Sequence, residues 1–302
     1  MGLIFFGTGT FAIPTLRALA GSVSLVVTQP DRQSGRGMRL QPSPIKLVAL
    51  ELGLAVESPE KSRSPEFVSR LEAENADALV VASYGQILSQ RVLDSAKRGG
   101  INLHGSILPK YRGAAPIQRC ILEGAPETGI TLMQMDKGMD TGNMIEVVRT
   151  PIGQDETYGE LQDRLAIIAA EMAVEWMPRI VVGDYESIPQ DNELATNAPK
   201  IEKAEAELNF TKPAIVEYNR FRAFTPAPGA FIRTSQGLIK LSSMRLSEAS
   251  GEPGVVVSVS PLTIAFGSGA LELHEVQPEG KKRMSGKDFA NGARIRPGSC
   301  LI

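Results

Sequence analysis

The sequence predicts an α/β protein with two domains, a doubly wound parallel sheet followed by a small antiparallel barrel. Short apolar runs alternate with helical patterns through the first half, and near residue 208 the pattern changes to short alternating runs between turns. The chain has 302 residues, enough for two domains that each bury a core. We therefore expect a first domain at residues 1–189, a linker at 190–207 and a second domain at 208–302.

The elements of the first domain follow from its apolar patterns. Short continuous apolar runs indicate buried strands, and they occupy residues 3–6, 23–27, 78–81 and 101–103. Helical spacing with a proline near the first turn indicates helices, which we expect at residues 14–20, 44–53 and 65–75. A longer amphipathic helix is expected at residues 157–182. Strands that alternate with helices predict a parallel sheet covered on both faces.

The second domain is separated from the first by a polar stretch. Residues 185–200 show no clear period, which is typical of a linker. Short alternating runs then lie between Gly, Ser and Pro residues, and they predict antiparallel strands at residues 229–233, 237–241, 255–259, 262–266 and 270–276. This spacing of short strands and turns is typical of a small barrel or sandwich.

Charge is distributed unevenly along the chain. Residues 1–207 contain 20 Lys and Arg against 27 Asp and Glu, whereas residues 208–302 contain 12 against 7. A basic end on an acidic body suggests that a polyanionic partner contacts the C-terminal third.

The composition excludes several classes of protein. Two cysteines, Cys120 and Cys300, are too few for a disulfide framework or a thiolate metal cluster. The first residues lack the basic start and long apolar core of a signal peptide, and no stretch approaches the roughly 18 apolar residues of a membrane span. We therefore expect a cytoplasmic protein that uses neither a membrane nor a metal.

A glycine-rich turn follows the first predicted strand. Gly7, Gly9 and Ala12 fit the Ala-ended dinucleotide fingerprint, and Asp31 lies near the end of the second strand. Glycine at a strand-to-helix turn is also needed for a tight turn and close packing. The motif therefore leaves two interpretations open, a nucleotide site and a packing requirement.

Residues 28–39 form a basic, glycine-punctuated insertion where a compact α/β unit would use a short loop. Three arginines, Arg32, Arg36 and Arg39, make this segment suited to phosphate contacts. The other interpretation is a solvated surface loop.

Polar side chains gather at the end of the fourth predicted strand. Asn102 and His104 are two residues apart, so both side chains point to the same side of an extended strand end. An amide can donate to an oxyanion, and an imidazole can take or hold a proton. Asp140, in a Gly-hinged loop after a strand at 130–135, is suited to orient His104. No Ser or Cys lies in a recognisable nucleophile elbow, which favours direct transfer over a covalent intermediate.

These segments resemble the folate-dependent formyltransferase family. The resemblance rests on Asn102-Leu103-His104-Gly105-Ser106, on Leu108-Pro109 followed by Arg112-Gly113-Ala114-Ala115-Pro116-Ile117-Gln118, and on Asp136, Gly138, Asp140 and Gly142. The methionyl-tRNA branch of this family has an insertion that resembles residues 28–32, 35–37 and 42–46 of this chain. The linker and barrel of that branch resemble residues 198–201, 222–224 and 228–230. The likeness runs in order along almost the whole chain.

The resemblance implies a Rossmann-like formyltransferase domain followed by an OB-like barrel that binds tRNA. It implies 10-formyltetrahydrofolate as the formyl donor and methionyl-initiator tRNA as the acceptor, for translation initiation. Asn102 and His104 would be the oxyanion donors, with Asp140 holding His104. Neither a metal nor a nucleotide is required, and we expect a monomer.

The resemblance also implies where the two substrates bind. The folate is expected at the carboxyl ends of the strands, against Tyr84, Gly85, Gln86, Ile87, Leu88, Ser106, Ile107, Leu108, Pro109 and Gly138. The tRNA is expected to contact Arg32, Arg36, Arg39, Lys281, Lys282 and Arg283.

The chain departs from the family pattern only in the linker and barrel, at Asn197, Asn209, Phe210, Thr225 and Ala227. These departures bear on tRNA contacts more than on chemistry. The alternatives are a related formyltransferase for an amino sugar or purine precursor, an NAD(P)-dependent oxidoreductase, and a non-catalytic RNA-binding protein. A small acceptor would need neither the basic insertion nor the basic barrel, so both favour tRNA.

Overall fold

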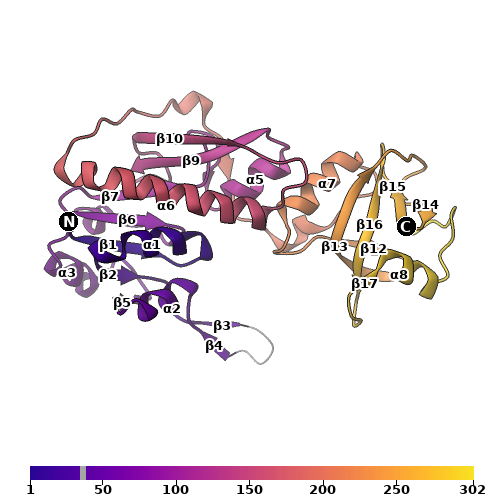
Figure 1. Cartoon of the computed structure of the whole chain (residues 1–302), viewed down its shortest axis with the longest axis horizontal. Helices are drawn as coiled ribbons and strands as arrows, with labels where there is room; N and C mark the ends of the chain where they lie inside the picture. Colours follow the sequence, from indigo (N-terminus) through magenta and orange to yellow (C-terminus); the bar gives the residue numbers. More distant parts are fainter. Residues whose placement is uncertain (35–38) are drawn as a thin grey trace. The chain divides into compact units, whose positions relative to one another are not determined.

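The computed structural model describes residues 1–34 and 39–302, which form two units (Figure 1). The N-terminal unit comprises Met1–Pro116, Glu127–Thr150 and Gln162–Pro199. The C-terminal unit comprises Ile117–Pro126, Pro151–Leu161 and Lys200–Ile302. Two short segments that precede residue 162 therefore belong to the C-terminal unit.

A seven-stranded sheet with the order β10-β9-β7-β6-β1-β2-β5 forms the centre of the N-terminal unit (Figure 1). Its strands are β1 (Leu3–Gly7), β2 (Val23–Val27), β5 (Ala55–Glu57), β6 (Ala78–Ala82), β7 (Gly100–His104), β9 (Glu127–Gln134) and β10 (Met144–Pro151). All four strands predicted from short apolar runs are confirmed. They are nearly free of exposed residues, as expected for strands covered on both faces.

The predicted parallel sheet is confirmed for β1, β2, β6 and β7, and it continues into β9, whose direction the sequence did not predict. Strand β1 pairs in parallel with β2 and β6, and β6 pairs in parallel with β7, but β9 pairs antiparallel with β7. An apolar run such as that of β9 carries no sign of its direction, because a buried strand is apolar in either orientation. Antiparallel strands are common at the edge of otherwise parallel sheets.

The N-terminal unit contains the helices α1 (Ile13–Leu19), α2 (Pro44–Glu51), α3 (Pro65–Ala73), α4 (Gln90–Leu93) and most of α6 (Tyr158–Val182), whereas α5 (Pro116–Leu122) belongs almost wholly to the C-terminal unit. The predicted helices are confirmed with bounds that differ by one or two residues. Two of them begin at a serine whose side chain accepts a backbone N–H, Ser43 from Lys46 and Ser64 from Phe67. Residues of α3 pack with Ile4 and Phe6 of β1 in one buried apolar cluster.

The described part of the basic insertion contains a short antiparallel hairpin of β3 (Arg32–Ser34) and β4 (Arg39–Gln41). The sequence predicted an irregular arm there, so this is a difference in local structure. Arg36 lies outside the described residues. Just before the hairpin, the carboxylate of Asp31 accepts from Nζ of Lys46 at 2.8 Å.

Residues 188–198, which we call the strap segment, lie along the N-terminal unit instead of passing through solvent. Ile188 pairs with Met144 through two backbone hydrogen bonds of 2.8 and 2.9 Å. Strand β11 (Asn197–Ala198) pairs in parallel with β8 (Arg112–Gly113). Backbone bonds such as these, and side-chain bonds of Gln190, hold the strap segment, and no apolar period in the sequence reveals them.

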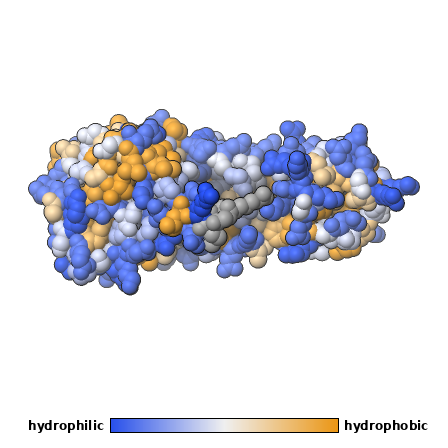
Figure 2. Space-filling model, turned by 90° about the horizontal axis from the view of Figure 1, so that it is seen from below, coloured by the Kyte–Doolittle hydropathy of each residue, from blue (hydrophilic) through white to orange (hydrophobic). Residues whose placement is uncertain are grey.

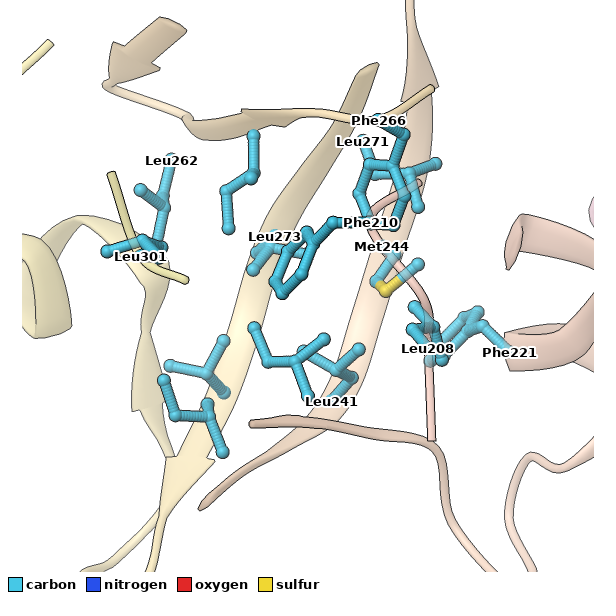
Figure 3. Close-up of a cluster of buried hydrophobic side chains, with 14 of the residues drawn as sticks. Leu208, Phe210, Phe221, Leu241, Met244, Leu262, Phe266, Leu271, Leu273 and Leu301 are labelled. Atoms are coloured by element: carbon cyan, nitrogen blue, oxygen red, sulfur yellow. The ribbon is translucent and has the colours of Figure 1, made fainter. Parts of the chain in front are cut away.

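The C-terminal unit has an antiparallel sheet in the order β12-β13-β16-β15-β14, with β17 paired to β16. The strands are β12 (Phe231–Thr234), β13 (Gly237–Ser247), β14 (Val256–Val259), β15 (Leu262–Ala265), β16 (Ala270–Pro278) and β17 (Met284–Ser285). Figure 3 shows its buried apolar core, in which Phe210, Phe266 and Leu271 lie close together. The five predicted strands and the antiparallel class are confirmed.

Two helices of the C-terminal unit, α7 (Ala214–Ala223) and α8 (Gly286–Gly292), were not predicted. Helix α7 buries charged residues, which hides its apolar periodicity. Glu217 is fully buried and accepts from Asn209 N and Arg220 Nε at 3.1 and 2.9 Å. Buried charges persist where they are paired and hydrogen-bonded in this way.

No helix of the described residues is long and apolar enough to cross a membrane.

Candidate active site

Strand β7 presents two polar side chains at its carboxyl end. Asn102 and His104 are only 9% and 5% exposed, although they are polar. They alternate with the buried residues Ile101 and Leu103, because successive side chains of a strand point to opposite sides. The predicted pair therefore lies on one side of β7, where the strand meets the loops that follow it.

The carboxylate of Asp140 lies against both side chains. Its Oδ2 is 3.6 Å from Nδ1 of His104, and its Oδ1 accepts from Nδ2 of Asn102 at 3.4 Å. The N–H of Gly113 donates to Oδ2 at 2.9 Å and fixes the carboxylate from a second loop. The structure thus brings together all three residues that the sequence predicts as catalytic.

The second ring nitrogen of His104 also faces an oxygen. Nε2 lies 3.0 Å from the carbonyl oxygen of Tyr111. A neutral imidazole can donate to only one of its two facing acceptors, Asp140 or Tyr111, whereas an imidazolium can donate to both. Both ring nitrogens of His104 therefore face an oxygen acceptor.

The loop after β7 is built on buried hydrogen bonds. The hydroxyl of Ser106 donates to the carbonyl oxygen of Lys110 at 2.7 Å, and that of Thr131 donates to the carbonyl oxygen of Ser106 at 2.7 Å. Leu108 N donates to the same Thr131 hydroxyl at 3.1 Å. Ser106 and Leu108 are therefore structural supports of the loop that carries Tyr111 and Gly113.

The loop that carries Asp140 is tightly constrained. Oδ1 of Asp136 accepts from Gly138 N and from the Thr141 hydroxyl at 2.9 and 2.7 Å. Asp140 itself has a φ of 54°, in the left-handed region that non-glycine residues seldom adopt. A Cβ added at Gly142 would overlap the carbonyl oxygen of Gln134, so glycine is required there.

A cavity of about 140 Å³ opens beside Asp140. It is lined by Gln86, Ile87, Leu88, Met133, Met135, Asp136, Lys137, Gly138, Met139 and Asp140. Gln86, Ile87, Leu88 and Gly138 are among the predicted folate contacts. Sequence reasoning missed the methionines, although the alternation of Met133 and Met135 at the end of a predicted strand places both on one side.

The other predicted folate residues have different surroundings. The described lining of the cavity does not include Tyr84, Gly85 or residues 106–109. The Tyr84 ring is buried, 5.1 Å from the ring of Phe6, and burial raises the pKa of Tyr84 to about 12. Its carbonyl oxygen accepts from the Thr8 hydroxyl at 2.8 Å. Tyr84 therefore contributes packing and leaves the cavity to residues 86–88.

The glycine-rich turn after β1 is explained by packing. A Cβ at Gly7 would lie 2.8 Å from the Phe5 ring and 2.9 Å from Cβ of Ala12. The acidic residue of the dinucleotide fingerprint, Asp31, is paired with Lys46. These contacts favour the packing interpretation of the motif over a nucleotide site.

The predicted tRNA contacts lie on both units. Arg32 is 66% exposed and 3.9 Å from Glu60, and Arg39 is also exposed. Lys281, Lys282 and Arg283 are exposed on the C-terminal unit. Figure 2 shows that hydrophilic side chains make up much of the visible surface of that unit. Such side chains are available to a large anionic partner.

Metal ligands do not cluster in the described part of the chain, where no group of three or more His, Cys, Asp or Glu could hold an ion.

Solved structures with the same fold include an N-formyltransferase. An N-formyltransferase from Helicobacter canadensis, in complex with folinic acid and dTDP-3-aminofucose, matches with a TM-score of 0.67 over 90% of this chain and 98% of that chain, at 19% identity. HypX from Aquifex aeolicus, in complex with tetrahydrofolic acid, matches with a TM-score of 0.63 over 96% of this chain and 47% of that chain, at 15% identity. At these identities the likeness shows the fold alone.

Sequence comparison shows the family. The family model described as formyl transferase matches residues 3–181, and that described as formyl transferase, C-terminal domain, matches residues 200–294. A methionyl-tRNA formyltransferase from Symbiobacterium thermophilum is 45% identical over 98% of this chain and 94% of its own length. One from Chromobacterium violaceum is 45% identical over 100% of this chain and 99% of its own length. The chain therefore belongs to the formyl transferase family, among the methionyl-tRNA formyltransferases.

Proposed function

We propose that the protein transfers the formyl group of 10-formyltetrahydrofolate to the α-amino group of methionyl-initiator tRNA, for translation initiation. The observation that carries this proposal is the convergence of Asn102, His104 and Asp140 at the end of β7, beside a cavity. The near full-length similarity to methionyl-tRNA formyltransferases supports the choice of acceptor.

The lining of the cavity beside Asp140 suits the ring system of the donor. A folate presents a flat ring system with hydrogen-bonding edges, and such ligands bind in pockets with apolar walls and a few polar groups. Leu88 and Met133 supply buried apolar surface, while Gln86 and Asp136 supply polar atoms at the same cavity. The donor supplies an activated formyl carbon that is open to attack by an amine.

The three polar side chains then have distinct roles. Attack by the amine places negative charge on the formyl oxygen, and the amide of Asn102 donates to it. The His104 ring gives up its contact with the Tyr111 carbonyl oxygen and contacts the formyl oxygen instead. Asp140 holds the charged ring and accepts the proton that the amine loses, on its way to the leaving nitrogen of the folate.

The surroundings of His104 favour direct transfer. Ser106 is the hydroxyl closest to His104 along the chain, but it is fully buried and donates to the Lys110 carbonyl at 2.7 Å. Such a hydroxyl is poorly placed as a nucleophile. The amine of the acceptor is therefore the attacking group, without a formyl-enzyme intermediate.

The remaining assignments complete the proposal. Along the sequence, we assign catalysis to residues 1–189 and tRNA binding to residues 208–302, with residues 190–207 connecting the two. Cations of the insertion and of the C-terminal unit contact tRNA phosphates, with Arg36, Arg39 and Lys281 among them. The protein works in the cytoplasm as a monomer and needs no metal.

The test is transfer from labelled 10-formyltetrahydrofolate to three acceptors in parallel: methionyl-tRNA, a nucleotide-linked amino sugar and a purine precursor amine. We expect labelled formylmethionine from the first and no product above background from the others. Formylation of either small amine at a higher rate than methionyl-tRNA would overturn the proposed acceptor.

A further inference from the structure

The strap segment carries a side chain that joins both loops of the active site. Gln190 is only 8% exposed. Its Nε2 donates to the carbonyl oxygens of Asp140 and Gly142 at 2.8 and 2.7 Å. Its Oε1 accepts from Nε and Nη2 of Arg112 at 2.9 and 2.7 Å. A glutamine amide has two donor hydrogens and two acceptor positions, so all four are in use.

These bonds bear on Asp140 because of its backbone. The φ of 54° places Asp140 in the left-handed region, which persists in a non-glycine residue only when the surroundings hold it. Gln190 bonds the carbonyl oxygens of Asp140 and Gly142, and thus both sides of this turn. A change in the turn would move the carboxylate away from His104 and Asn102.

The acceptor side of the amide reaches the other loop. Arg112 directly precedes Gly113, whose N–H donates to the Asp140 carboxylate at 2.9 Å. Arg112 also donates from Nη2 to Oδ1 of Asn192, a second residue of the strap segment, at 2.9 Å. Gln190 therefore fixes Asp140 twice, through its own carbonyl oxygen and through the loop that supplies a donor to its carboxylate.

We infer that Gln190 is a positioning residue for the transfer reaction, acting through Asp140. This inference rests on the proposed function. The four bonds of the amide end on backbone oxygens and on Arg112, so Gln190 contributes geometry and not chemistry. Displacing a catalytic group by about 1 Å can cost about 100-fold in rate. Loss of the amide should therefore lower kcat about 10- to 100-fold and leave both KM values within about twofold.

The experiment compares Gln190→Met, which keeps the length of the side chain but removes its hydrogen bonds, with the wild-type chain. Rates are measured in single-turnover formylation at saturating methionyl-tRNA and 10-formyltetrahydrofolate, together with KM values and thermal midpoints. Asn192→Ala is the matched control, because it removes another acceptor of Arg112 without touching residues 140–142; its rate should stay within threefold of wild type. If Gln190→Met is poorly folded, Gln190→Glu tests the donor side alone, since it keeps an acceptor for Arg112 but removes the N–H donors to the carbonyl oxygens of Asp140 and Gly142, and its rate should fall as well.

A double-mutant cycle separates positioning from general stability. In an Asp140→Asn background the carboxylate is already lost, so adding Gln190→Met should lower the rate by less than about threefold. An equal fold-loss in both backgrounds would overturn the inference, as would a Gln190→Met rate within twofold of wild type. Failure of the proposed function is separate, because the wild-type chain itself would then not formylate methionyl-tRNA.

Discussion

The end of β7 and the basic surface of the C-terminal unit use polar side chains in opposite ways. His104 is 5% exposed and both of its ring nitrogens face oxygens within 3.6 Å. Lys281 and Lys282 are exposed. A reaction needs groups held in one geometry, whereas attraction of a polyanion depends on the number of cations. Single substitutions at the end of β7 should therefore lower the reaction rate strongly. Single substitutions on the basic surface of the C-terminal unit should weaken tRNA binding by small, additive amounts.

Changes at the end of β7 should be the most damaging. His104→Ala and Asp140→Asn should each lower the single-turnover formylation rate by at least about 100-fold, the scale of a lost acid–base or oxyanion group. The control is His274→Ala, which removes the other histidine of the chain, on β16. Rates within threefold of wild type for either active-site variant would remove that residue from the mechanism.

Arg36→Ala should have an intermediate and selective effect. Loss of one charge-assisted phosphate contact corresponds to about 1.4 kcal/mol, so kcat/KM for methionyl-tRNA should fall about tenfold. The Kd for the folate should stay within about twofold. Arg17→Ala, on α1 and paired with Glu51, is the control. Equal weakening of both substrates would show that the insertion builds the folate site.

Removal of the exposed cations of the C-terminal unit should change the salt dependence of binding. Replacing Lys281, Lys282 and Arg283 together by serine should reduce the log–log slope of tRNA binding against salt by about one unit per lost phosphate contact. Lys97→Ser, on the N-terminal unit, is the single-charge control. Substitution is a better test than truncation after residue 207, because Pro151–Leu161 belongs to the C-terminal unit and would lose its neighbours. Unchanged slopes would leave these cations without a role in binding.

The smallest expected effect concerns stability. Replacing Glu205 should lower the free energy of unfolding by an amount that depends on pH. The hydrogen bonds of the Arg119 guanidinium, at 2.6 and 3.0 Å, lower the pKa of the Glu205 carboxyl. Because the folded-state pKa lies below the unfolded value of about 4.3, the stabilisation is present above that pH and is lost as pH falls through the folded-state pKa.

Glu205→Gln should therefore reduce the free energy of unfolding by about 1 kcal/mol at pH 7, and by progressively less below about pH 4. The control is Glu207→Gln, whose partner Arg233 is 65% exposed, and it should change stability by less than about 0.5 kcal/mol. Denaturant unfolding followed by circular dichroism at pH 7 and pH 3.5 makes the comparison. A Glu205→Gln loss that is equal at both values would contradict the pKa-based account.

The parts of the fold that were predicted are those with a regular side-chain pattern. The apolar runs of β1, β2, β6 and β7 are buried by covering helices, so burial and sequence agree. Helix α7 was missed because Glu217 and Arg222 occupy buried positions that a helix normally fills with apolar residues. The sequence left the direction of β9 open, because a buried strand has the same composition in either direction.

The residues of the candidate site also divide into those that a side-chain pattern predicts and those that it does not. The spacing of Asn102 and His104 on a strand end predicts their common direction, and the structure places Asp140 against both. The sequence predicts a linker at the strap segment because its polar residues show no period, yet backbone atoms such as the oxygen of Thr196, which accepts from Arg112 N at 2.8 Å, and the side chain of Gln190 hold it in place. Neither composition nor period shows which residues a polar segment contacts, so the neighbours of Gln190 became visible only in three dimensions.

The most direct test of direct transfer at the end of β7 follows the label itself. The protein is mixed with labelled 10-formyltetrahydrofolate, with or without methionyl-tRNA, quenched within one turnover, and the label on protein and on methionine is counted. We predict no label on the protein in either case, and label on the methionine amine at a rate that falls at least about 100-fold in Asp140→Asn. Stoichiometric label on the protein without tRNA, or an Asp140→Asn rate equal to wild type, would contradict the account.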